Sequence, residues 1–80
     1  MSLQESIVTQ LERAGFRVVR RTSALVFLVH PNRPGLLVRV GTVYVVAECN
    51  GREATRQRLD AVDVETLLRR CDGEMTELGR

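Results

Sequence analysis

Asn50 and Gly51 form the strongest turn signal in the chain and constrain how the segments on either side of them meet. A two-residue hairpin turn of the primed type needs positive φ at both central residues, and Asn-Gly adopts it readily. Segments 42–49 and 52–58 are therefore expected to be antiparallel strands. The expected register contains three cross-strand pairs: Cys49 with Arg52, Ala47 with Ala54, and Val45 with Arg56.

Three more strands are expected before this hairpin, at 16–21, 24–29 and 36–40, because these short runs are rich in valine, leucine and phenylalanine. The run 24–29 shows no polar alternation, which is typical of a central strand that is covered on both faces or lies against a partner chain. Segment 31–35 holds two prolines and a glycine, so it forms a turn.

A helix is expected at each end of these strands. The first has an apolar stripe at helical spacing and a capping box in which Ser2 and Glu5 bond reciprocally, and it ends at Gly15. The second begins at Asp60 or Asp63 and ends at Gly73, with Arg69 and Arg70 in its last turn. The stripe residues are Leu3, Ile7, Leu11 and Ala14 in the first helix and Val64, Leu67, Leu68 and Cys71 in the second.

The chain of 80 residues fits one domain of the α+β class. We expect an antiparallel four- to five-stranded meander sheet flanked by an N-terminal and a C-terminal helix, in a domain of residues 1–73 with a frayed tail at 74–80. If both helices cover one face of the sheet, the other face is exposed and indicates a partner. Its candidate apolar residues are Val19, Leu25, Phe27, Leu37, Tyr44 and Val46.

Composition excludes several classes of protein. All twelve basic residues are arginine, yet the net charge of +2 is too small to bind nucleic acid by bulk attraction. No apolar run approaches the roughly 18 residues that a membrane span needs. Residues 1–10 do not resemble a secretion signal, so a cytoplasmic location is expected. The spacing of Cys49 and Cys71 matches no metal or redox motif, and two buried free thiols are expected.

Catalytic residues are scarce in this sequence. His30 is the only histidine and lies beside a turn, where a surface role is expected. Paired carboxylates, a glycine-rich phosphate loop and a metal-ligand cluster are all missing from the sequence pattern. We therefore expect a protein without enzyme activity, cofactor or metal.

Three short motifs within residues 3–38 resemble the HicA toxin family: LERAGF at 11–16, VVRRTS ending at Ser23, and FLVHP at 27–31. The resemblance implies a double-stranded-RNA-binding-like fold of helix, three strands and helix, and RNA as substrate. The family's catalytic histidine directly follows the serine that matches Ser23, and Ala24 occupies that position here. His30 matches a later, non-catalytic feature of the family.

Arginines on the expected strands indicate a binding surface, because guanidinium groups pair with carboxylate or phosphate. We expect this surface to dock on an acidic protein or nucleoprotein and block it. The chain is similar in size to small inhibitors from phages and mobile elements, including anti-CRISPR proteins. Candidate binding residues are Arg17, Arg39, Arg52, Arg56, Arg58 and Tyr44.

Three alternatives to this docking role stay open. In the first, the arginines serve only to keep a small sheet soluble. A module of the HicA type would bind or cleave RNA directly. A structural homodimer would join two copies through an apolar strand or an open sheet edge, whereas the docking protein itself could be a monomer or a dimer.

Overall fold

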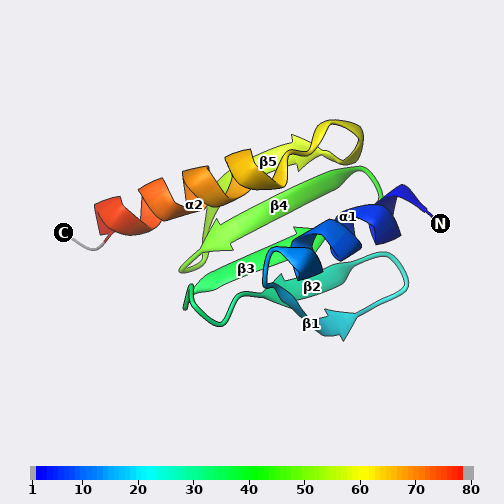
Figure 1. The fold of residues 1–80 in the computed structure, drawn as a ribbon, viewed down its shortest axis with the longest axis horizontal. Coiled ribbons are helices and arrows are strands. Elements are labelled where there is room, and N and C mark those ends of the chain that lie inside the picture. The colour runs from blue at the N-terminus through cyan, green and yellow to red at the C-terminus, as the bar shows by residue number, and fades with distance from the viewer. Residues whose placement is uncertain (1, 79–80) are drawn as a thin grey trace.

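A helix, five strands and a second helix follow one another in the computed structural model, which describes residues 2–78 (Figure 1). The expected α+β class and the meander topology are both confirmed, and the fifth strand is present. The elements are α1 (Leu3–Arg13), β1 (Arg17–Arg21), β2 (Val26–Val29), β3 (Leu36–Val40), β4 (Tyr44–Cys49), β5 (Arg52–Arg58), the short 3-10 helix η1 (Leu59–Ala61) and α2 (Val64–Leu78).

The five strands form one sheet in the order β1-β2-β3-β4-β5, and each strand is antiparallel to its neighbours. Both helices lie on the same side of this sheet (Figure 1), with α1 against β1 and β3 and α2 against β4 and β5. The opposite side carries no element of the described chain, and we call it the open face. Strand alternation and register assign to it Arg17, Arg20, Phe27, Val29, Leu37, Arg39, Tyr44, Val46, Glu48, Glu53, Arg56 and Arg58.

The hydrophobic core lies between the sheet and the two helices. Leu28, Val38 and Val45 on the sheet are fully buried, as are Leu11 on α1 and Leu67 on α2. Burial of one such side chain contributes roughly 1.5–3 kcal/mol to folding. The predicted apolar stripes of both helices therefore supply the layer that covers one face of the sheet.

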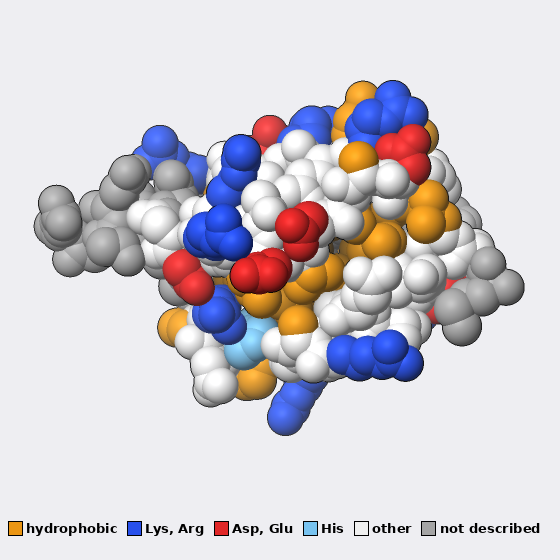
Figure 2. Space-filling model, turned by 45° about the horizontal axis from the view of Figure 1, so that its top comes forward, with side chains coloured by type: hydrophobic (Ala, Val, Ile, Leu, Met, Phe, Trp, Pro, Cys, Tyr) orange, Lys and Arg blue, Asp and Glu red, His pale blue; other side chains and the backbone are white. Residues whose placement is uncertain are grey.

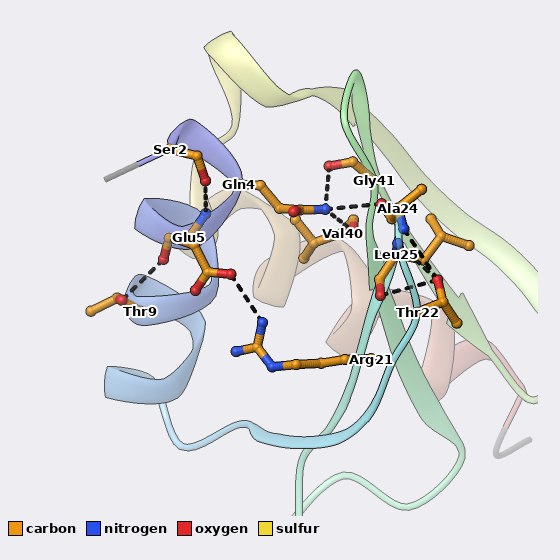
Figure 3. Close-up of polar contacts among 10 residues, drawn as sticks. All are labelled: Ser2, Gln4, Glu5, Thr9, Arg21, Thr22, Ala24, Leu25, Val40 and Gly41. Atoms are coloured by element: carbon orange, nitrogen blue, oxygen red, sulfur yellow. Dashed lines mark hydrogen bonds and ion pairs between the residues drawn. The ribbon is translucent and has the colours of Figure 1, made fainter.

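Helix α1 has defined ends. The Ser2 hydroxyl accepts the backbone N–H of Glu5 at 3.1 Å (Figure 3), as predicted. The Glu5 carboxylate does not reach back to complete a capping box; it accepts a hydrogen bond from Arg21 Nη1 at 2.9 Å instead. At the other end, Gly15 has a φ of 102°, and the N–H of Phe16 donates to Leu11 O at 3.0 Å. This bond is typical of a Schellman motif, in which glycine adopts the left-handed conformation.

The side chain of Gln4 ties the start of α1 to the sheet (Figure 3). Its Nε2 lies 3.0 Å from the carbonyl oxygen of Ala24 and 3.1 Å from those of Val40 and Gly41. One amide group thus shares its two hydrogens among carbonyls just before β2 and at the end of β3. These contacts orient the first turn of the helix over the sheet.

The hairpin between β4 and β5 contains an irregularity that the sequence does not predict. Asn50 and Gly51 have φ values of 53° and 83°, and Cys49 pairs with Arg52, as expected. The other two predicted pairs are wrong, because Ala54 is an extra residue that makes a β-bulge. Beyond the bulge the pairs are Ala47 with Thr55, Val46 with Arg56, Val45 with Gln57 and Tyr44 with Arg58.

Helix α2 begins at the second of its two candidate caps. The Asp63 carboxylate accepts the N–H of Glu65 at 3.1 Å and the hydroxyl of Thr66 at 2.8 Å, and the hydrogen bond from Thr66 lowers the pKa of Asp63. Asp60 belongs to η1 and pairs with Arg58 instead.

The predicted end of α2 at Gly73 is wrong, because the helix continues to Leu78 and its last part extends beyond the sheet (Figure 1). Arg69 and Arg70 therefore lie in the middle of the helix. Residues 79–80 of the predicted tail lie outside the described residues.

Candidate interaction face

One row of side chains crosses the open face through all five strands. The register pairs its members in succession, from β1 to β5, so that arginine and apolar side chains alternate. Neighbouring strands lie about 4.8 Å apart, so each arginine-bearing strand lies about 10 Å from the next one along the row. We call this the arginine row; its members are Arg20, Phe27, Arg39, Val46 and Arg56.

Arg39 occupies the centre of the arginine row. Its Nη2 lies 2.9 Å from Glu48 Oε1, and its side chain is 37% exposed. Its Nε is buried and has no hydrogen-bond partner among the residues that the structure describes. A buried donor without an acceptor costs about 1–3 kcal/mol, so Nε of Arg39 is an unsatisfied donor within the open face.

Arg56 contacts both a carboxylate and an aromatic ring. Its Nη2 donates to Glu53 Oε1 at 2.9 Å, and its Cζ lies 5.3 Å from the centroid of the Tyr44 ring. The hydrogen bond lowers the pKa of Glu53 and raises that of Arg56. The β-bulge at Ala54 is what places Arg56 on the open face, because it pairs this arginine with Val46.

Arginine side chains also cover the apolar members of the row. The Cζ of Arg20 lies 5.9 Å from the centroid of the Phe27 ring. Val46 is only 7% exposed although no helix covers it. Phe27 and Leu37 are likewise half-buried. The aliphatic stems of long charged side chains can shield an open sheet in this way while their charged groups remain in water.

A hollow of about 300 Å³ opens on this face beside Arg39 and Arg56, and we call it the Arg39–Arg56 hollow. Its walls combine guanidinium groups, a phenol ring and aliphatic side chains. The lining residues are Leu25, Arg39, Gly41, Thr42, Val43, Tyr44, Val46 and Arg56.

The structure brings together three of the six predicted binding residues: Arg39, Arg56 and Tyr44 line one hollow. The other three do not line this hollow. Arg17 pairs with Val29 at the β1 edge, and Arg52 pairs with the buried Cys49 and so starts β5 on the helix side. Arg58 bonds Asp60 and lines a different hollow with Leu3 and Leu59.

Sequence reasoning did not select three residues that contribute to this face: Arg20, Glu48 and Glu53. Arg20 pairs with Phe27 because Val19 is an extra residue in β1, another irregularity of register. Glu48 lies between the core residues Ala47 and Cys49, so this alternation was the available signal for the carboxylate that pairs with Arg39. Glu53, which pairs with Arg56, follows the exposed Arg52 and has no such signal.

His30 is buried, so the surface position expected from the sequence is wrong. It is only 8% exposed, and its ring lies edge-to-face on Phe16 with 5.0 Å between centroids. Nδ1 accepts the N–H of Asn32 at 3.1 Å, so the tautomer with a proton on Nε2 donates to Ala14 O, also at 3.1 Å. Both ring nitrogens therefore form hydrogen bonds with backbone groups.

The two cysteines are buried free thiols. Burial, followed by the influence of Cys49, raises the pKa of the Cys71 thiol to about 11. Within residues 2–78, no group of three or more His, Cys, Asp or Glu side chains could hold a metal ion.

The helix-bearing side has a mixed charge pattern. Basic and acidic side chains lie beside one another there, with apolar side chains visible between them (Figure 2). Two ion pairs contribute to this pattern, Arg33 with Asp72 and Arg69 with Glu65. No helix in the described part of the chain is long and apolar enough to span a bilayer.

Comparisons of the chain with protein-family models, with curated proteins and with solved structures return no match. The fold and the open face together define a small two-layer α+β domain with one uncovered sheet surface. Any function for this chain therefore has to follow from its own residues.

Proposed function

We propose that the protein is a non-catalytic interaction module that docks its open face on an acidic protein or nucleoprotein and blocks the surface it covers. The arginine row is the observation that carries this proposal. Its three arginines belong to alternate strands of one sheet, with Phe27 and Val46 between them. Such a row combines charge for orientation with apolar area for affinity.

The charges on the open face favour an acidic partner. Arg17 and Arg20 form no ion pair with any residue in the described range, whereas Arg39 and Arg56 are each paired through one terminal nitrogen. A guanidinium has five N–H donors in a planar fork, so all four arginines retain donors for carboxylates. Arginine is also enriched at the energetic centres of protein interfaces.

A protein surface suits this face better than bare nucleic acid does. Glu48 and Glu53 lie among the arginines and would repel a phosphate backbone. The rings of Phe27 and Tyr44, which could stack on bases, have guanidinium groups over them. The apolar residues of the row instead match the mixed apolar and charged character of protein interfaces.

A comparison of two double variants tests the proposal. Arg39→Ala with Arg56→Ala removes the charge at the hollow, whereas Arg13→Ala with Arg70→Ala removes two exposed arginines from the helices. Each immobilised variant is incubated with lysate of the source cells, and the captured proteins are quantified by mass spectrometry. We expect a set of acidic proteins that binds the wild type and the helix variant but is depleted at least tenfold on the open-face variant.

Two measurements make this comparison decisive. Circular dichroism and thermal unfolding establish that both variants fold, since exposed ion pairs contribute only about 0–1 kcal/mol each. The proposal would be contradicted if both double variants captured equally reduced amounts of the acidic proteins. It would also be contradicted if neither variant changed the amount captured. Capture that disappears on nuclease treatment and falls steeply with salt would assign the face to nucleic acid instead.

A further inference from the structure

The Arg39–Arg56 hollow contains unused hydrogen-bond donors next to an apolar wall. Arg39 forms an ion pair with Glu48 through Nη2, while its buried Nε has no partner among the described residues. Arg56 donates a hydrogen bond from Nη2 to Glu53. Each guanidinium thus engages one carboxylate through one terminal nitrogen, which leaves several N–H groups for a second acceptor.

The remaining lining restricts what can accept these donors. Leu25, Val43 and Val46 supply aliphatic surface, and Tyr44 supplies a phenol that is 41% exposed. The volume of about 300 Å³ equals the lower end of the range for small-ligand sites, about 300–1,000 Å³. A ligand that fits must therefore be small and carry both an apolar part and an anionic oxygen pair.

We infer that this hollow binds a carboxylate side chain of the protein partner, with apolar neighbours of that residue on Leu25, Val43 and Val46. The inference deepens the proposed function and rests on it. A carboxylate matches the planar fork of a guanidinium and presents two oxygens. Its methylene stem and the flanking residues of the partner would contact the aliphatic wall.

Glu48 and Glu53 act as internal substitutes for the partner's carboxylate. Both ion pairs are partly exposed, with side-chain exposures of 24% for Glu48 and 47% for Glu53. Ion pairs near the surface contribute little to stability, so their exchange for an incoming carboxylate costs little. A doubly charged phosphate is disfavoured, because it would face two carboxylates and an apolar wall at once.

Two matched peptides, Ac-Leu-Glu-Leu-NH₂ and Ac-Leu-Gln-Leu-NH₂, test this inference, with butyrate and methyl phosphate as further probes. Binding is followed by NMR of the arginine Nε–H groups and the valine methyl groups. The Glu peptide is expected to shift the NMR signals of Arg39, Arg56 and Val46 until they saturate. It should bind at least tenfold more tightly than the Gln peptide. Butyrate should bind more weakly at the same residues, because it lacks the flanking leucines.

Three variants separate recognition in the hollow from general charge attraction. Arg39→Lys keeps the charge but removes Nε and the planar fork of the guanidinium. It should lower the affinity for the Glu peptide at least fivefold. Glu53→Gln removes the carboxylate that pairs with Arg56 and should raise the affinity for the Glu peptide two- to fivefold. Arg13→Lys, at an exposed position of α1, should leave the affinity for the Glu peptide unchanged. NMR spectra of each variant show directly whether it remains folded.

Equal binding of the Glu and Gln peptides, or tighter binding of methyl phosphate, would overturn the inference. An Arg39→Lys variant that binds like the wild type would overturn it as well. These outcomes differ from failure of the docking proposal. Loss of partner capture by the open-face variant without peptide binding refutes the carboxylate site alone, whereas peptide binding without any effect on capture refutes docking through this face.

Discussion

Gly15 and His30 lie so close together that a Cβ atom on Gly15 would stand 2.8 Å from Nε2 of His30. The φ of 102° at Gly15 turns the chain from α1 into β1, and the imidazole fills the space beside this turn. Since Nε2 also bonds Ala14 O, the last turn of α1 is held by a side chain that directly follows β2. The end of the helix and the sheet are therefore coupled.

Gly15→Ala is expected to lower the free energy of unfolding by about 2–4 kcal/mol, because it combines a strained positive φ with a steric clash at the imidazole. Urea denaturation followed by circular dichroism measures this change. Gly73→Ala is the matched control: among the described residues, nothing beyond the backbone of its own helix lies within 4 Å of its Cβ position, and alanine is the better helix former. This control should stabilise the protein by about 0.5–1 kcal/mol. Similar effects of the two substitutions would refute the coupling.

His30→Ala should destabilise the fold by about 2–4 kcal/mol, since it leaves two backbone groups without partners and opens a space against Phe16. Chemical denaturation at pH 7 measures the loss. Arg70→Ala, at an exposed helix position, should change the free energy of unfolding by less than about 0.5 kcal/mol. A His30→Ala variant as stable as the wild type would show that the ring does not support the structure.

The raised pKa of Cys71 predicts a loss of stability at alkaline pH. The folded protein holds the thiol proton up to a pKa of about 11, whereas the unfolded thiol loses it near its ordinary value of 9.0. Stability from the buried neutral thiol is complete below pH 9 and falls as the pH rises towards 11, by about 2 kcal/mol. Urea denaturation from pH 8 to 11 should show this decrease in the wild type but not in Cys71→Ala. An identical slope in both proteins would contradict the assignment.

The Arg33–Asp72 pair predicts the opposite dependence at acid pH. The hydrogen bond from Arg33, 2.9 Å from Nε to Oδ1, lowers the pKa of Asp72. A lowered carboxyl pKa contributes stability above its ordinary value of about 3.9, and the contribution is lost as the pH falls through the folded value. Asp72→Asn should therefore cost less than about 1 kcal/mol at pH 7 and nothing at pH 2. A difference that persists at pH 2 would assign the effect to packing.

Local sequence determined the order of elements well because their ends depend on single residues. Asn50 and Gly51 adopt the positive φ values that their turn requires, and Gly15 does the same after α1. Gly73 shows the limit of this reasoning. Its φ is not positive, and the residues that follow it continue the helix to Leu78. A glycine permits a helix to end but does not require it.

The β-bulge at Ala54 could not be predicted, because the regular and the bulged register both agree with the local pattern. Contacts outside the hairpin favour the bulged one: Thr55 is 5% exposed on the helix side, and Gln57 Oε1 accepts the N–H of Asp63 at 3.1 Å. Arg56 reaches the open face through this shift. The sequence therefore predicts an arginine-bearing sheet, whereas the grouping of Arg39, Arg56 and Tyr44 depends on tertiary packing.

Site-specific photo-cross-linking tests the docking claim most directly. A benzoylphenylalanine in place of Leu37 lies on the open face next to the arginine row, and the same residue in place of Gln10 lies on the exposed side of α1. Irradiation in the source cells should give a discrete adduct with an acidic protein from position 37 and none from position 10. An adduct formed only from position 10, or equally from both, would contradict docking through the open face.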